Sequence, residues 1–197
     1  LALAAAGEPA SWNTDVFIYY LISKQRPAGN WHGVGSTRAP IQDGDFSRTA
    51  MGIRTLVAYG TPGRKEEIDG RVKRAANWLE AQTPLTTEDR VMQLLGLKWA
   101  GTGARLRDTR IRELAAQQRA DGGWAQTLFL QSDAYATGQV LYTLRELGMA
   151  PTNEAFRRGV EYLLQTQRDD GSWYVQSRAK KIQPYFESGF PYGHDQW

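Results

Sequence analysis

Several acidic and aromatic side chains of this sequence have the type and position to transfer a proton or bind a ligand. Asp43 and Asp45 belong to a long loop that ends at Phe46, where a helix is expected to begin. Carboxyl groups donate and accept protons, and aromatic side chains line apolar pockets. The candidate catalytic acids are Asp43, Asp45 and Asp133. The candidate ligand-binding residues are Asp45, Phe46, Tyr135, Tyr185, Phe186 and Glu187.

The sequence gives no reason to expect a metal ion or another cofactor. The chain has no cysteine, which excludes thiolate ligands and disulfides, and its two histidines are His32 and His194. Both could join Asp43 or Asp195 in a metal site. However, His32 follows a tryptophan in a long loop, whereas His194 lies in the unrelated stretch PYGHDQW. We therefore assign no metal ligand and no cofactor.

The composition is that of a single soluble domain, residues 1–197. Hydrophobic residues make up 41% of the chain and charged residues 23%, which is enough for one substantial core. The net charge of +3 is scattered along the chain and does not indicate nucleic acid. No apolar run approaches the ~20 residues of a membrane span, and the opening LALAAAG is too short for a signal peptide. We expect a soluble or peripheral membrane protein of undetermined compartment.

A seven-residue pattern, Gln-x-x-x-Gly-x-Trp, occurs three times. It runs from Gln25 to Trp31, from Gln118 to Trp124 and from Gln167 to Trp173. A second pattern, Leu-x-x-x-Gly, alternates with it and ends at Gly7, Gly60, Gly101 and Gly148. These glycines follow apolar runs and are typical of left-handed helix ends. Spacings of this size indicate a repeat of two helices.

The two helices of each repeat differ in their hydrophobic pattern. Residues 133–147 are small or apolar on nearly every face, which favours a helix buried on two sides. Residues 152–167 are amphipathic, with Phe156, Val160, Leu163 and Leu164 on one stripe. This alternation predicts an all-α fold, an α/α toroid or an open arc of about four hairpins. Inner helices are expected at 45–59, 87–100 and 132–147, and outer helices at 11–25, 65–82, 104–118 and 152–167.

The Gln-x-x-x-Gly-x-Trp pattern has a structural interpretation. The glycine permits a sharp exit from the outer helix, and the tryptophan can cover the gap to the next helix pair. The glutamine amide can bond free backbone groups at an adjacent helix end. We expect six structural staples between repeats, Gln25, Trp31, Gln118, Trp124, Gln167 and Trp173, while Gln82 marks a degenerate copy.

The stretch RRGVEYLLQTQRDDGSW, Arg158 to Trp173, resembles the QW repeat of squalene–hopene and oxidosqualene cyclases. The resemblance covers the whole chain, and protein-prenyltransferase β-subunits share the same ring. It implies an α/α toroid whose inner-helix ends face a hydrophobic central cavity. For the cyclases it also implies metal-free protonation of an isoprenoid by an acid in a DxDD motif at the start of an inner helix.

The sequence lacks the DxDD motif that carries the catalytic acid in this family. The best match to DxDDTA is DFSRTA, Asp45 to Ala50, in which only the first acid remains. Ser47 stands where the proton donor is expected, and a hydroxyl is too weak an acid to protonate an alkene. Arg48 beside it would repel a developing carbocation. The other inner-helix starts lack DxDD, and Asp89 or Asp133 can serve there as helix caps. The prenyltransferase zinc site and the lanthionine-cyclase site both need a cysteine.

Three functions therefore stay open. The first, which we favour, is a non-cyclising module that binds an isoprenoid or lipid or acts in recognition. The second is part of an active triterpene cyclase, a class II terpene cyclase-like isomerase or lyase, whose acid lies outside this segment. The third is a helical-repeat scaffold for protein partners. The segment alone is expected not to be an enzyme, and the basic-aromatic stretch Arg178, Lys180, Lys181 and Tyr185 could contact a membrane surface.

The two ends of the sequence resemble interrupted inner helices. LALAAAG has the end of such a helix without its beginning, and YGHDQW resembles the start of the next one. We expect a piece of a larger toroid, covered by the rest of the same polypeptide or by a second copy.

Overall fold

The structure is a computed structural model and describes residues 2–33, 39–40 and 44–178. Within these ranges all regular elements are helical, which confirms the all-α class, and an isolated β-bridge joins Ala125 to Ser132. The elements are α1 (Ala2–Ala5), α2 (Trp12–Lys24), α3 (Asp45–Tyr59), the 3-10 turn η1 (Pro62–Arg64), α4 (Lys65–Ala81), α5 (Thr87–Trp99), α6 (Ala104–Ala116), α7 (Ala134–Glu146) and α8 (Glu154–Thr166).

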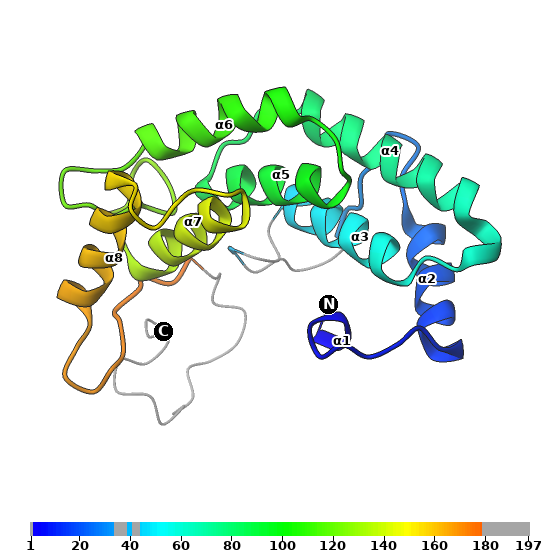
Figure 1. Ribbon diagram of the computed structural model, residues 1–197, viewed down its shortest axis with the longest axis horizontal. Helices are drawn as coiled ribbons and strands as arrows, with labels where there is room; N and C mark the ends of the chain where they lie inside the picture. Colours follow the sequence, from blue (N-terminus) through cyan, green and yellow to red (C-terminus); the bar gives the residue numbers. More distant parts are fainter. Residues whose placement is uncertain (1, 34–38, 41–43, 179–197) are drawn as a thin grey trace.

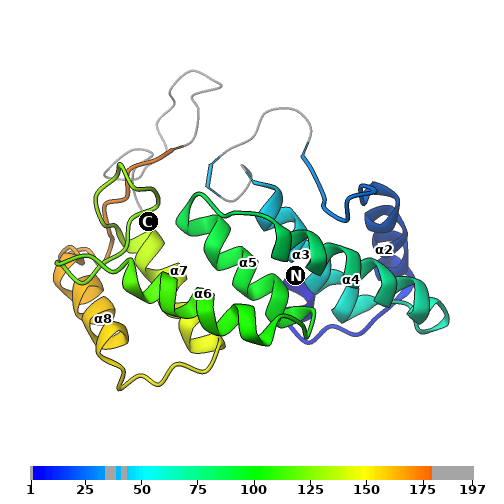
Figure 2. The same ribbon diagram turned by 90° about the horizontal axis from the view of Figure 1, so that it is seen from above.

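These helices form an arc of two layers (Figure 1). Helices α4 and α6 follow its convex side, and α3, α5 and α7 lie beneath them, with α2 and α8 at the two ends. Seen from above, α3, α5 and α7 lie side by side (Figure 2), and α5 packs against both α3 and α7. Each inner helix therefore contacts its inner neighbours as well as outer helices.

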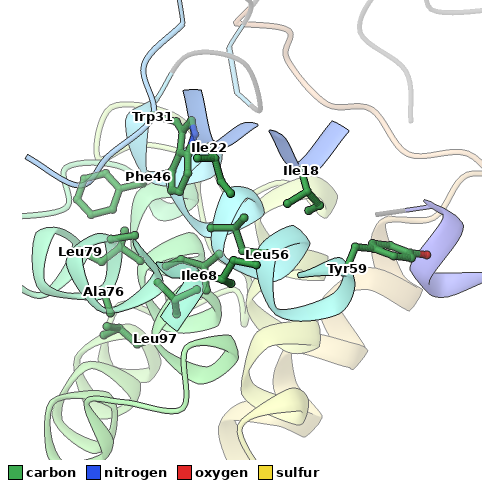
Figure 3. Packing of buried hydrophobic residues seen from close by; sticks show 13 residues of the cluster. Ile18, Ile22, Trp31, Phe46, Leu56, Tyr59, Ile68, Ala76, Leu79 and Leu97 are labelled. Carbon is green, nitrogen blue, oxygen red and sulfur yellow. The ribbon is translucent and has the colours of Figure 1, made fainter. Parts of the chain in front are cut away.

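The core is divided between two clusters that meet at α5. The first lies among α2, α3, α4 and α5 and includes Ile18, Ile22, Leu56 and Leu79 (Figure 3). The second lies among α5, α6, α7 and α8. Helix α5 supplies Leu97 to the first cluster and Val91, Leu94 and Leu95 to the second, so it joins the two halves of the arc.

The tryptophans of the three repeated patterns adopt the same geometry. The indole Nε1 of Trp31 donates to the carbonyl oxygen of Leu21, that of Trp124 to Leu114, and that of Trp173 to Leu163, each at 2.8 Å. Each ring thus bonds to the outer helix that precedes it, ten residues back along the chain. Trp31 and Trp124 are buried, whereas Trp173 is only half-buried.

The glutamines close the same turns and, in two copies, reach the next outer helix. Gln25 Nε2 donates to the carbonyl oxygen of Gly29 at 2.9 Å and to that of Arg71 in α4 at 3.0 Å. Gln118 Nε2 donates to Gly122 at 2.8 Å and to Ala155 in α8 at 2.7 Å. The acceptors in α4 and α8 lie within helices and are not the free helix-end groups that the sequence interpretation assumed.

The degenerate second copy, at Gln82, lacks the glycine and tryptophan, and a side chain of the next inner helix binds its backbone instead. Gln93 of α5 is fully buried, and its Nε2 donates to the carbonyl oxygens of Leu79 at 2.6 Å and Gln82 at 3.1 Å. The side-chain amide of an inner helix therefore binds carbonyl groups at the end of α4. In the other copies, the glutamine and tryptophan of the turn itself bind the backbone there.

Two local expectations were wrong. Gly60 was expected to be left-handed like the other helix-end glycines, but its φ is −57°, whereas those of Gly7, Gly101 and Gly148 are positive. In α8, Val160 and Leu164 were expected on the buried stripe, but both are exposed. Only Phe156 and Leu163 pack against the core, because the described helices contact α8 from one side.

Candidate functional site

An apolar groove of about 540 Å³ lies among α1, α2 and α3. One wall is a face of α2, formed by Phe17, Ile18, Tyr20 and Leu21. Ile18 is buried in the core, while Phe17 and Tyr20 leave 65% and 62% of their surface exposed. Large apolar side chains are rarely left this exposed together, and such surfaces commonly bind a partner or ligand.

The opposite wall is a face of α3, formed by Met51, Gly52, Thr55 and Tyr59. Gly52 is required because a Cβ there would lie 2.8 Å from the ring of Trp31, which forms part of the groove floor. Tyr59 extends from the far end of α3 (Figure 3), and its hydroxyl donates to the carbonyl oxygen of Glu8 at 3.0 Å. This bond ties the segment after α1 to α3 and closes that end of the groove.

The other end of the groove is basic. Its lining includes Lys24 at the end of α2, His32 in the loop that follows, and Arg48 in the first turn of α3. Among the described lining residues none is acidic. A mostly apolar pocket with a few polar groups gathered at one place is the usual form of a small-molecule site.

Asp45 lies beside this basic end, at the first position of α3. Its Oδ2 accepts a hydrogen bond from Asn30 Nδ2 at 2.7 Å, and its Oδ1 lies 2.7 Å from Nδ1 of His32. The carboxylate therefore orients the imidazole, whose Nε2 lies on the other side of the ring. Asp45, a predicted catalytic and ligand-binding residue, contacts His32 and is not itself part of the groove lining.

Phe46, a predicted ligand-binding residue, does not line the groove. The ring is buried in the first core cluster and packs against Trp78, with ring centroids 5.4 Å apart. As the second residue of α3 it points into the gap toward α4, on the side of the helix away from the groove.

A second polar feature joins the first turns of the three inner helices. Ser47 Oγ of α3 donates to Glu88 Oε1 of α5 at 3.2 Å, and Tyr135 Oη of α7 donates to Glu88 Oε2 at 3.0 Å. Gln139 Nε2, one turn further along α7, donates to the same Oε2 and to the Tyr135 hydroxyl. We call Ser47, Glu88, Tyr135 and Gln139 the polar row.

Glu88 is the acceptor at the centre of the polar row. It is 4% exposed, and Ser47 is fully buried. Three donors converge on its two oxygens, and the residue lies in the first turn of α5. Burial, followed by the negative charge of Glu88, raises the pKa of Tyr135 far above its usual value, so its hydroxyl remains a donor. Both oxygens of Glu88 are therefore engaged by side chains of the neighbouring inner helices.

Asp133, the third candidate acid, is the N-cap of α7. Its Oδ1 accepts the backbone N–H of Ala136 at 2.8 Å, and its Oδ2 accepts from Gln126 Nε2 at 2.9 Å. Burial raises the pKa of this carboxyl, although these hydrogen bonds oppose the effect. Asp89 caps α5 together with Thr86. The geometry around both aspartates is that of helix capping.

Sequence reasoning missed Glu88, although a signal for it exists. Ser47, Glu88 and Tyr135 each precede a Leu-x-x-x-Gly glycine by the same interval, so they are equivalent positions of three successive repeats. It also missed the groove, whose walls become adjacent only when α2 packs on α3. The remaining candidates, Asp43, Tyr185, Phe186 and Glu187, lie outside the described residues, as do His194 and Asp195.

In the described part of the chain, no three histidine or acidic side chains gather as metal ligands would. None of the described helices has the length and apolar character needed to cross a membrane. No known protein family and no curated protein sequence matches the chain.

Proposed function

We propose that this chain is a non-cyclising, squalene-cyclase-like repeat domain that binds the hydrocarbon chain of an isoprenoid or other lipid. The two-layered arc would be part of an α/α toroid, and the binding site would be the groove among α1, α2 and α3. The observation that carries the proposal is this groove of about 540 Å³ with apolar walls. Its volume lies within the range of about 300–1,000 Å³ that is common for small-molecule pockets.

The contacts of the groove suit a hydrocarbon chain. Its walls present the rings of Phe17 and Tyr20 on one side and Met51 on the other. Each methylene removed from water contributes about 0.8 kcal/mol, offset by the entropy lost on binding. A ligand that covered the exposed rings of α2 would also remove protein apolar surface from water.

The geometry argues against a cyclase reaction by this chain. Ser47 occupies the position of the family acid and donates to Glu88 instead of to a substrate. Glu88 in turn accepts three hydrogen bonds. Incubation of the purified chain with squalene or oxidosqualene should therefore give no cyclic triterpene by mass spectrometry. Detection of such a product would favour the alternative of an active cyclase segment.

A protein-interaction scaffold is the second candidate, and the surface of α2 favours it. Trp12 and Tyr19 are 79% and 66% exposed, and neither lines the groove. Aromatic side chains of this kind are enriched in protein interfaces. This candidate predicts binding that depends on Trp12 and Tyr19, whereas lipid binding should depend on the groove.

The test is to titrate the chain with farnesol and dodecanol in a calorimeter and to fill the groove by substitution. Thr55→Phe places a ring between the two walls. Thr166→Phe is the matched control, because both hydroxyls bond the carbonyl four residues back at 2.8 Å, but Thr166 is exposed at the end of α8. We expect Thr55→Phe to abolish binding and Thr166→Phe to leave it unchanged. The proposal fails if neither alcohol binds, or if Thr55→Phe, shown to be folded by circular dichroism, still binds them fully.

A further inference from the structure

We propose that the third turn of the repeated pattern, with the adjoining surface of α8, is a docking site for a helix of a partner protein. That helix presents a glycine or alanine at the contact and an arginine close to it. The site lies at the opposite end of the arc from the groove (Figure 1). We call its residues the α8 face: Val160, Leu164, Gln167, Asp169 and Trp173.

The glycines of the pattern show how the third turn differs from the first two. In the first turn, a Cβ on Gly29 would collide with the backbone carbonyl of Arg74 in α4. In the second, a Cβ on Gly122 would lie 2.7 Å from the carbonyl oxygen of Arg158 in α8. Around Gly171, in the third turn, no other described helix comes within 4 Å of such a Cβ. The third turn therefore has open the place that an outer helix occupies in the other two.

The side-chain amide of Gln167 has a donor that the described part of the chain does not use. Its Nε2 donates to the carbonyl oxygen of Gly171 at 2.9 Å, which closes the turn, and to no other described residue. The amides of Gln25 and Gln118 make the same bond and also donate to a carbonyl of the next outer helix. Gln167 is exposed, whereas the other two are partly buried. A docked helix would supply the missing acceptor.

Apolar side chains next to the third turn are uncovered as well. Val160 and Leu164 stand seven and three residues before the glutamine of the third pattern. Their counterparts in the first pattern, Ile18 and Ile22, are buried in the core cluster to which α4 contributes. Val160 and Leu164 are instead 37% and 66% exposed. The α8 face thus combines exposed apolar groups with an unused donor, as interaction surfaces do.

The two helices that are docked on such turns show what the partner must present. Gly159 of α8 lies against the turn, because a Cβ there would be 2.9 Å from the ring of Trp124. Ala75 holds the equivalent place in α4 and is fully buried. Each docked helix also carries an arginine that donates to backbone carbonyls of the preceding outer helix or its turn, Arg71 in α4 and Arg158 in α8.

The third turn offers a carboxylate to such an arginine. Asp169 stands where the second turn has Ala120, whose carbonyl oxygen accepts from Arg158 at 3.0 Å. Asp169 is exposed and takes part in none of the ion pairs found among the described residues. An arginine placed as Arg158 is would therefore approach a carboxylate in addition to the carbonyl.

A second copy of the chain does not offer such a helix. In each copy α4 and α8 hold their small residues against their own turns. Helix α2 has an exposed face, but its 13 residues include no arginine, glycine or alanine. Helix α6 has no glycine, and its alanines lie at its two ends, whereas Ala75 and Gly159 stand within their helices. The occupant is therefore a helix of a different protein.

The probe for the site is a fluorescein-labelled peptide of residues 151–167, which contains the docking face of α8, and the readout is its anisotropy with the full chain. In the peptide, Gly159→Leu places a side chain against the Trp173 ring and should weaken binding about tenfold or more. Leucine is a better helix former than glycine, so a loss of peptide helicity would not explain this result. The control peptide Glu161→Leu adds the same side chain at an exposed position and should bind like the unchanged peptide.

Two variants of the chain test the α8 face itself. Gln167→Ala removes the unused donor and should weaken peptide binding about fivefold, the usual contribution of one hydrogen bond. Its matched control is Gln165→Ala, at an exposed position of the same helix. Asp169→Asn should weaken binding about twofold at low salt and have no effect at high salt. Asp108→Asn removes an exposed carboxylate of α6 and should leave binding unchanged.

Three results would overturn the docking site. The first is no binding at about 1 mM peptide, the weakest affinity that a specific contact would have. The second is binding that neither Gln167→Ala nor the peptide change Gly159→Leu weakens, because the peptide then binds elsewhere. The third is self-association of the chain, measured by sedimentation, that Gln167→Ala abolishes, which would assign the α8 face to a second copy. Thr55→Phe fills the groove and should not affect peptide binding, so this test and that of the proposed function fail independently.

Discussion

The Ser47 hydroxyl donates to the carboxylate of Glu88 at 3.2 Å, and the two residues occupy equivalent positions of successive inner helices. Tyr135, at the same position of the third inner helix, donates to the other oxygen of Glu88. The repeat thus brings one sequence position of three helices into a single hydrogen-bonded row. This row joins the inner layer of helices at its first turns.

Removing the centre of the polar row should destabilise the fold. Glu88→Ala leaves the fully buried Ser47 hydroxyl without its acceptor and should cost about 1–3 kcal/mol, the usual penalty for an unsatisfied buried group. Glu88→Gln should cost less, because its amide oxygen still accepts from one side of the row. Urea titration, monitored by circular dichroism, measures the free energy of unfolding of both variants.

The control for this prediction is Glu66→Ala. Glu66 lies in the first turn of α4, as Glu88 does in α5, but it is exposed. Its removal tests the helix-dipole contribution without burial and should change stability little. A loss in Glu88→Ala no larger than that in Glu66→Ala would show that the row contributes nothing to stability.

The tryptophan staples should differ in energy although their sequence patterns are the same. Trp124 is 1% exposed, and its replacement by alanine should cost about 3–5 kcal/mol. Trp173 makes the equivalent indole bond to Leu163 but is half-buried, so Trp173→Ala should cost about 1–2 kcal/mol. Denaturant titration of the two variants decides this, and equal losses would mean that burial by the next repeat is not the main contribution.

Helices α2 to α8 could be predicted from the sequence to within two residues at each end, from the two repeated patterns together with the hydrophobic periodicity. These patterns depend on residues within one short segment, so they can be recognised without knowing the fold. The partners of Glu88 come from helices more than forty residues away on either side, so no local pattern shows them. The packing of Phe46 against Trp78 is likewise not visible in the sequence. A helix start does not reveal which of its side chains faces Trp78 and which faces the groove.

Two glycines of the repeated pattern offer a matched test of how repeats approach each other. Gly122 and Gly171 have φ values of +87° and +84°, so alanine is strained by about 1–2 kcal/mol at either position. At Gly122, however, a Cβ would also lie 2.7 Å from the carbonyl oxygen of Arg158 in α8, whereas Gly171 has no such neighbour. Gly122→Ala should therefore be the more destabilising variant by thermal unfolding. Equal midpoints for the two would mean that α8 shifts freely away from the turn.

The phenol of Tyr162 should make stability fall at alkaline pH. Its hydroxyl donates to the carbonyl oxygen of Ser132 at 2.6 Å, and burial, followed by the charges of Asp121 and Asp133, raises its pKa to about 12. In the unfolded chain the pKa is about 10, so above that pH the folded state binds more protons than the unfolded state. The free energy of unfolding then decreases with rising pH between about 10 and 12.

Tyr162→Phe should remove this contribution. The variant loses the bond to Ser132 and is less stable at neutral pH, but its free energy of unfolding should decline less steeply from pH 10 upward. Tyr135, whose pKa is also raised, keeps part of the slope, so the decline should shrink without vanishing. Urea titrations of both proteins at pH 9, 10 and 11 compare the slopes. Parallel declines would mean that the Tyr162 phenol ionises as readily in the folded chain as in the unfolded one.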